Sequence, residues 1–362
     1  MSDTAYLILE NGMVFEGTYF GAKGEIAGAI VFTTGMTGYL ETLTDQSYYG
    51  QIVLQTFPLI GNYGVIPSDF ESDSIGASAY IVKHPCQEPS NFRSEGALDT
   101  FLKQKNIVGL CGIDTRCITK IIRENGVMNG KITGIKPDNM DLSDFKAYKI
   151  ENAVSAVSCT KVRKYAADNA KYTVALMDFG MKENIKRELI NRGCDVWVFP
   201  HNSTLQDIQA VNPDGIMLSN GPGDPAENAE IIRNLKDMIA SNIPIFGICL
   251  GHQLLALAQG FSTHKLKYGH RGANQPVKDL VSGRVYITSQ NHGYAVSTDS
   301  IDSAIAEQWF ENVNDKTCEG ICYKSSNAFS VQFHPEACGG PLDTAFLFDK
   351  FIENLEVSKK CH

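Results

Sequence analysis

The sequence predicts an α/β protein with a doubly wound, mostly parallel sheet, preceded by a smaller β-rich domain of the α+β type. Short β-prone apolar runs alternate with helical patterns over about residues 173–258, as is typical of parallel sheets covered by helices. Near the start, Asn11-Gly12 separates two apolar runs, which favours an antiparallel hairpin. The 362 residues exceed the size of most single cores, so we expect two domains.

The first domain is expected over residues 1–150, a linker over 151–171 and the second domain over 172–362. The linker is proposed because apolar periodicity is lost there and Ser, Ala and Lys accumulate. Helices are predicted at about 96–105 and 114–124. Asp114 is suited to cap the second of these helices at its start and Gly126 to end it.

The second domain is predicted to alternate strands and helices up to a buried strand at 245–248. Its expected strands are 173–178, 195–199, 214–218 and 245–248, and its expected helices are 182–191, 205–211 and 226–239. In such sheets ligands bind beyond the carboxyl ends of the strands. Candidate functional residues are therefore sought at those ends.

Composition excludes several function classes. The net charge of −9 and the lack of a Lys/Arg-rich block argue against a nucleic-acid or anionic-membrane partner. No signal peptide or membrane span is recognised, so a cytoplasmic protein is expected. The ten cysteines are scattered without paired CxxC spacing, which indicates reduced thiols, and no metal site is assigned.

Cys249 lies where the strand at 245–248 is expected to turn directly into a helix. Gly247 and Gly251 flank it, and small residues at these positions are needed for the tight turn of a nucleophile elbow. Such a turn pushes the side chain out of the sheet edge and places the sulfur at a helix N-terminus, where unpaired N–H groups favour a thiolate. A lone cysteine is more often a small core residue, so a catalytic role requires a partner elsewhere in the chain.

His334 is the candidate partner. It follows a predicted strand at 329–333, and Glu336 lies two residues further on. In extended chain these two side chains share a face, so Glu336 could orient the imidazole as the third member of a triad. The alternative is a loop histidine beside a solvated acid.

The loop at 218–225 contains Gly221, Gly223 and then Asp224. Its exposed N–H groups could hold an oxyanion together with the N–H of Leu250. A plain turn before a helix capped by Asp224 explains the same residues.

Together these motifs resemble the class I, triad-type glutamine amidotransferases. The resemblance rests on Cys249 with its glycines and Gln253, on the glycine loop and on His334 with Glu336, in this order. The N-terminal half resembles the small, glutamine-hydrolysing subunits of carbamoyl phosphate synthetase. That second resemblance is carried by residues 37–39, 44–48, 61–64, 90–93 and 112–116, joined by 178–184 and 290–294. Gln46 departs from the pattern, since many relatives have proline there.

The resemblance implies a role for each matching residue. Cys249 would attack the side-chain amide of L-glutamine, His334 would transfer protons and Glu336 would orient His334. Gly223 and Leu250 would supply oxyanion N–H groups. The residues implied to hold glutamine are Ser47, Gly221, Gln253, Asn291, Gly293 and Tyr294.

The resemblance also implies a partner. No phosphate-binding loop for ATP is recognised, so ATP and magnesium would be used by a large synthetase subunit, with no cofactor in this chain. That subunit would turn ammonia and bicarbonate into carbamoyl phosphate for pyrimidine and arginine synthesis, and the first domain would be its docking surface. Two alternatives stay open: the glutaminase subunit of another amidotransferase, and a non-catalytic regulatory subunit.

Overall fold

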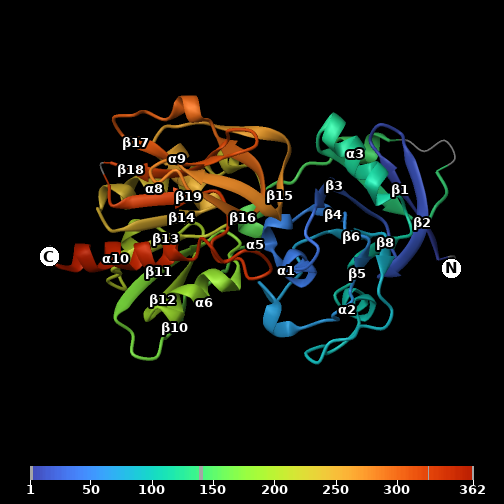
Figure 1. Ribbon diagram of the computed structural model, residues 1–362, viewed down its shortest axis with the longest axis horizontal. Helices are drawn as coiled ribbons and strands as arrows, with labels where there is room; N and C mark the ends of the chain where they lie inside the picture. The colour runs from blue at the N-terminus through green and yellow to red at the C-terminus, as the bar shows by residue number, and fades with distance from the viewer. Residues whose placement is uncertain (1–2, 138–141, 325, 361–362) are drawn as a thin grey trace. The chain divides into compact units, whose positions relative to one another are not determined.

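The computed structural model describes residues 3–137, 142–324 and 326–360. The chain divides into two compact units, Met1–Glu151 and Asn152–His362, and each is described here by itself. Figure 1 follows both units along the chain. Within the described ranges, no helix combines the length and the apolar character needed to cross a membrane.

The first unit is built on a closed barrel. Around the barrel the strands follow the order β1 (Thr4–Leu9), β2 (Val14–Gly21), β8 (Val108–Cys111), β6 (Ala79–Val82), β4 (Gln51–Gln55), β3 (Ile26–Thr33) and β9 (Met128–Thr133). The pairs β3–β4, β4–β6 and β6–β8 are parallel, whereas the other pairs are antiparallel. The unit thus begins as the expected antiparallel hairpin but continues with parallel strands.

The described part of the first unit also contains short helices, 3₁₀ turns and two short strands outside the barrel. They are α1 (Tyr39–Thr44), η1 (Gln46–Tyr48), β5 (Leu59–Ile60), η2 (Pro67–Asp69), β7 (His84–Pro85), α2 (Leu98–Gln104), α3 (Thr115–Asn125) and α4 (Ser143–Lys146). The two helices predicted from sequence are confirmed as α2 and α3. Asp114 caps α3 by accepting a hydrogen bond from the Cys117 N–H, and Gly126 ends the helix with φ 95°. One apolar cluster joins α1 and α2 to strands β4 and β6.

The second unit contains one ten-stranded sheet. Its strands follow the order β10 (Arg163–Tyr165), β12 (Cys194–Pro200), β11 (Tyr172–Asp178), β13 (Gly215–Leu218), β14 (Ile245–Ile248), β19 (Ala328–Val331), β18 (Cys318–Tyr323), β17 (Ala306–Asn312), β15 (Thr263–Asp279) and β16 (Val285–Val296). The pairs from β12 to β19 are parallel. All pairs from β19 to β16, and the pair β10–β12, are antiparallel.

Helices cover both faces of this sheet. They are α5 (Ala153–Val157), α6 (Glu183–Asn191), α7 (Leu205–Gln209), η3 (Pro225–Glu227), α8 (Ala229–Ala240), α9 (Leu250–Ala258), η4 (Thr298–Ser300) and α10 (Phe346–Lys360). Apolar side chains of α8 and α9 pack in one buried cluster, and those of α6 and α10 pack in a second. The parallel strands therefore run between two apolar layers.

The alternation predicted for residues 173–258 is confirmed element by element, with one shift. The helix expected from residue 226 begins as α8 at Ala229, because Pro225–Glu227 form a separate 3₁₀ turn. The antiparallel strands β15 to β18 were not predicted. Part of the expected linker is also structured, since it contributes α5 and the edge strand β10, which pairs with β12.

Candidate active site

The turn from β14 to α9 has the geometry of a nucleophile elbow. Cys249 occupies the position before α9 with φ 53° and ψ −102°, a conformation that non-glycine residues rarely adopt. A Cβ at Gly251 would lie 2.5 Å from the Leu218 carbonyl oxygen, and one at Gly247 would lie 2.9 Å from the Gly251 backbone. Both glycines are therefore required by close approach of the backbone, as the sequence predicted.

The Cys249 thiol is held inside the protein beside strand β16. The residue is 2% exposed, and its Sγ lies 3.7 Å from the Asn291 carbonyl oxygen. Its own N–H donates to the Val331 carbonyl. The N–H of Leu250, by contrast, belongs to the first turn of α9, where backbone donors have no partner within the helix.

His334 and Glu336 form a buried pair. The His334 Nδ1–H donates to Glu336 Oε1 over 2.7 Å, and both side chains are almost completely buried. The predicted contact is present, but its expected geometry is wrong. The two residues lie in a turn, in which the Ala337 N–H donates to the His334 carbonyl, rather than in extended chain.

The electrostatics link this pair to Cys249. Burial and Lys182 both oppose a charged imidazole, but Glu336 and Cys249 outweigh them and raise the pKa of His334 above its usual value. The opposite nitrogen, Nε2, is buried and has no hydrogen-bond partner within the described chain. That nitrogen is therefore available to a reacting group, and the hydrogen bond from Nδ1 to Glu336 fixes the tautomer of the ring.

Lys182 also belongs to this site, although no catalytic role was predicted for it from the sequence. Its Nζ lies 3.6 Å from Glu336 Oε1, and its side chain is only 10% exposed. Burial opposes ionisation of Glu336, but His334 and Lys182 hold its pKa below the usual value. Lys182 lies just past the carboxyl end of β11. Because ligand sites form beyond the carboxyl ends of parallel strands, this position could have identified Lys182 as a candidate site residue.

The glycine loop lies at the carboxyl end of β13 and is tied to the end of β11. Asn220 accepts from the Lys182 N–H and donates to the Gly180 carbonyl. A Cβ at Gly221 would lie 2.2 Å from the Phe179 carbonyl oxygen, and Gly223 has φ 91°. Asp224 caps the following 3₁₀ turn through the Ala226 N–H, as expected.

The other predicted binding residues divide between the two units. Gln253 on α9 donates to the Tyr294 carbonyl and to Gln332, which ties α9 to strand β16. Asn291, Gly293 and Tyr294 lie on β16. Burial and nearby Asp224 raise the pKa of Tyr294 to about 12, so its hydroxyl lies close to the glycine loop.

Ser47 lies in the first unit, within η1. It is buried, and its N–H donates to Asp45 Oδ1 over 2.9 Å. The structure therefore gathers Cys249, His334, Glu336 and the β16 residues within one unit. The contribution of Ser47 stays a prediction.

Comparison with known proteins gives matches over both units. Residues 7–132 match the family "Carbamoyl-phosphate synthase small chain, CPSase domain", and residues 175–354 match "Glutamine amidotransferase class-I". Proteins named carbamoyl phosphate synthase small chain are similar over almost their whole length. The one from Clostridium perfringens is 51% identical over 96% of this chain and 99% of its own. The one from Fusobacterium nucleatum is 48% identical over 98% of this chain and 99% of its own.

Proposed function

The chain belongs to the carbamoyl phosphate synthase small chain family, and from that membership we propose that Cys249, His334 and Glu336 are the residues that hydrolyse glutamine. The family hydrolyses glutamine and transfers the ammonia to a large subunit. The observation that carries the assignment of residues is the buried His334–Glu336 pair, coupled electrostatically to a cysteine at a strained elbow.

The first half of the reaction forms a covalent intermediate. His334 Nε2 takes the thiol proton as Cys249 Sγ attacks the side-chain amide carbon of L-glutamine, and the amide oxygen becomes an oxyanion. The carbon–nitrogen bond then breaks as His334 Nε2–H gives its proton to the departing ammonia. A glutamyl thioester on Cys249 is left.

The second half returns the enzyme to its starting state. His334 Nε2 takes a proton from a water molecule, whose oxygen attacks the thioester carbon. Glutamate leaves and Sγ takes back a proton from His334 Nε2, so one glutamine and one water give one glutamate and one ammonia. Glu336 keeps the imidazole in position through Nδ1 in both halves, and it is itself held by Lys182.

The oxyanion is stabilised by two N–H groups in this proposal. Leu250 supplies one from the first turn of α9, and Gly223 supplies the other from the glycine loop. The positive φ of Gly223 and the helix N-terminus at Leu250 are features of backbone that binds negative charge. Removing one such donor typically reduces turnover by about 10²–10³-fold.

Glutamine is held by polar groups around the sulfur. We propose Ser47, Gly221, Gln253, Asn291, Gly293 and Tyr294 for this role. The contacts of Gln253 with the Tyr294 carbonyl and of the Cys249 thiol with the Asn291 carbonyl support the proposal for the residues of the second unit.

The partner is proposed to be the large synthetase subunit, which uses ATP, magnesium and bicarbonate. This chain would need no cofactor for thioester chemistry, because a thiol, an imidazole and a water molecule supply every atom that moves. The first unit would be the docking surface, and a cytoplasmic location is proposed for the complex.

The direct test is Cys249→Ser, assayed in the complex with the large subunit. Glutamine-dependent carbamoyl phosphate formation should fall by about 10³-fold or more, whereas formation from free ammonia should be unchanged. Cys322→Ser is the matched control, since Cys322 is half-buried and lies in the second unit, outside the proposed triad. Retention of glutamine-dependent activity in Cys249→Ser would refute the proposed nucleophile.

A further inference from the structure

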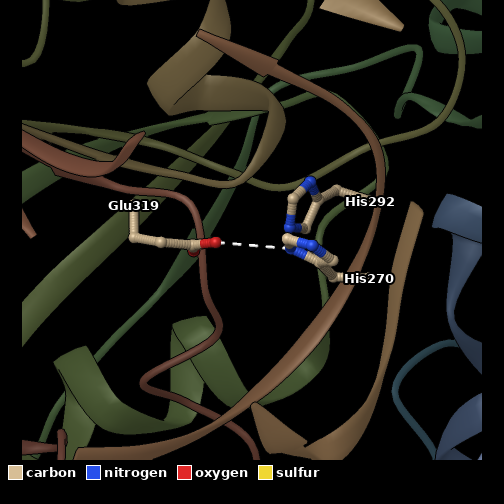
Figure 2. A group of neighbouring side chains, drawn as sticks. All are labelled: His270, His292 and Glu319. Carbon is tan, nitrogen blue, oxygen red and sulfur yellow. Dashed lines mark ion pairs between the residues drawn. The ribbon is translucent and has the colours of Figure 1, made fainter. Parts of the chain in front are cut away.

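Three buried side chains outside the proposed triad converge in the second unit. His270 on β15 and His292 on β16 are direct cross-strand partners, and Glu319 lies on β18. Figure 2 shows the two imidazoles facing each other, with the Glu319 carboxylate pointing toward His270. One ligand atom from each residue can be chosen so that all three lie within 4.8 Å of one another.

The two ring nitrogens of His270 have different surroundings. Its Nε2 donates to Asp315 Oδ2 over 2.7 Å. Its Nδ1 is buried, has no hydrogen-bond partner in the described chain, and lies 3.4 Å from Glu319 Oε1. An imidazole that donates to a carboxylate through one nitrogen and presents the other to a shared centre is the usual arrangement of a metal ligand.

His292 has the complementary arrangement. Its Nδ1 donates to the Tyr294 carbonyl over 2.7 Å, so in the neutral ring Nε2 carries a lone pair. That nitrogen lies 3.1 Å from Gln290 Oε1. The amide orientation of Gln290 follows from its own Nε2, which donates to Glu319 Oε2 and to Thr288 Oγ1.

Hydrogen-bond acceptors therefore face one another in the protein interior. A neutral His292 directs a lone pair at an amide oxygen, and His270 Nδ1 faces a carboxylate without a hydrogen bond. Buried lone pairs that converge in this way require a positive species between them.

We propose that His270 Nδ1, His292 Nε2 and Glu319 Oε1 form a binding site for a divalent transition metal ion, with zinc as its occupant. Two imidazoles and one carboxylate are donors that zinc accepts, and Gln290 Oε1 or a water molecule completes four-coordination. Donors at about 2.1 Å around a tetrahedral ion lie about 3.4 Å apart, which matches the His270–Glu319 separation. The remaining donor pairs lie within 4.8 Å of one another and must approach by at most about 1.4 Å to reach that separation.

The ion would have a structural role. It would tie β15, β16 and β18 together one residue from Asn291, whose carbonyl lies beside the Cys249 thiol. The site shares no ligand with the proposed triad, so the inference does not depend on the proposed function. No metal site was predicted from the spacing of the cysteines, and none of the ligands proposed here is a cysteine.

The rival occupant is a proton on His270. Burial opposes that proton, but Asp315 and Glu319 raise the pKa of His270 to about 9. Metal binding must displace it, which is common for imidazole ligands. Direct titration with a metal probe separates the two possibilities.

The test is a Co²⁺ and Zn²⁺ titration of the full-length chain, stripped of metal by a chelator. It is made in the Cys249→Ser background, which removes the buried Cys249 sulfur as a competing ligand. One Co²⁺ per chain should bind with the visible absorption of a tetrahedral nitrogen and oxygen site, without a sulfur charge-transfer band, and one Zn²⁺ should displace it.

Variants locate the ion. Glu319→Gln and His270→Asn should each weaken binding by about 100-fold or more, and Asp315→Asn by about 10- to 100-fold. His264→Asn, an exposed histidine on the same strand, should bind as the background does. Thermal melts without metal check that the variants fold. If the variants of the buried residues do not fold, Asp315→Asn still tests the site, because the Asp315 side chain is 43% exposed. Absence of stoichiometric binding, or binding unaffected by these changes, would overturn the proposal in favour of a proton.

Discussion

Cys249 adopts a backbone conformation that is unfavourable for any residue with a side chain. Its φ of 53° and ψ of −102° persist only because β14, α9 and the two flanking glycines hold the turn. Strain of this kind has a free-energy cost of about 1–3 kcal/mol and gathers at functional sites. In this turn it directs the sulfur toward β16 and away from the β14 ladder.

Glu336 gives a prediction about acid stability. Its folded pKa is lowered from 4.5, so its stabilisation is present above about pH 4.5 and is lost as the pH falls through the folded value. The stabilisation from His334, whose pKa is raised, is fully present below its unfolded pKa and is lost only as the pH rises through the folded value. Urea unfolding should therefore show Glu336→Gln less stable than the native chain near pH 7, with the gap narrowing as the pH falls below about 4.5. A gap that widens in acid would contradict the account.

The candidate site was predictable where its chemistry is local in sequence. Gly247 and Gly251 signal the elbow because they flank the cysteine, and His334 and Glu336 are only two residues apart. Lys182 and the cluster of His270, His292 and Glu319 depend on strand neighbours that sequence spacing does not reveal. The pairing of His270 with His292, for example, follows from bulged register between β15 and β16.

Among the elements, the parallel strands were predictable and the antiparallel extension was not. The parallel strands are short and apolar, because both faces are covered. Strands β15 to β18 form four of the ten strands of the sheet but carry many polar residues, and β15 is interrupted by register shifts. Their pattern lacks the alternation that identifies a half-buried strand.

Helix α10 gives a prediction at this scale. Phe351 and Leu355 are fully buried beneath the sheet, and a Cβ at Gly215 on β13 would lie 2.3 Å from Leu355. Phe351→Ala should lower the free energy of unfolding by about 3–5 kcal/mol in urea titration. Val357→Ala, at a position 60% exposed on the same helix, should stay within about 0.5 kcal/mol. Equal effects of the two changes would show that α10 is not docked as described.

At the scale of the whole molecule, the two units have separate cores. The chemistry proposed for glutamine uses residues of the second unit, with Ser47 as the contribution of the first. The barrel with its parallel strands was not foreseen, because the Asn11-Gly12 hairpin is a local signal and the parallel pairings join distant segments.

The large subunit should change the activity of the whole chain. Ammonia release from glutamine by the isolated chain is expected to be slow and to rise by about 5- to 150-fold on binding the partner, the range of common coupling energies. Ammonia production measured with and without the large subunit checks this expectation. Equal rates would show that the glutaminase is not coupled to its partner.

The central claim is that Cys249 carries the glutamyl group during turnover. Acid quenching of the complex with glutamine, followed by mass spectrometry of the intact chain and its peptides, tests this claim most directly. The account predicts a glutamyl adduct on the peptide containing Cys249 in the native chain or in His334→Asn, in which water attack on the thioester lacks its proton acceptor, and no adduct in Cys249→Ser. An adduct on another residue, or turnover with no adduct under any quench condition in native chain and variant alike, would contradict it.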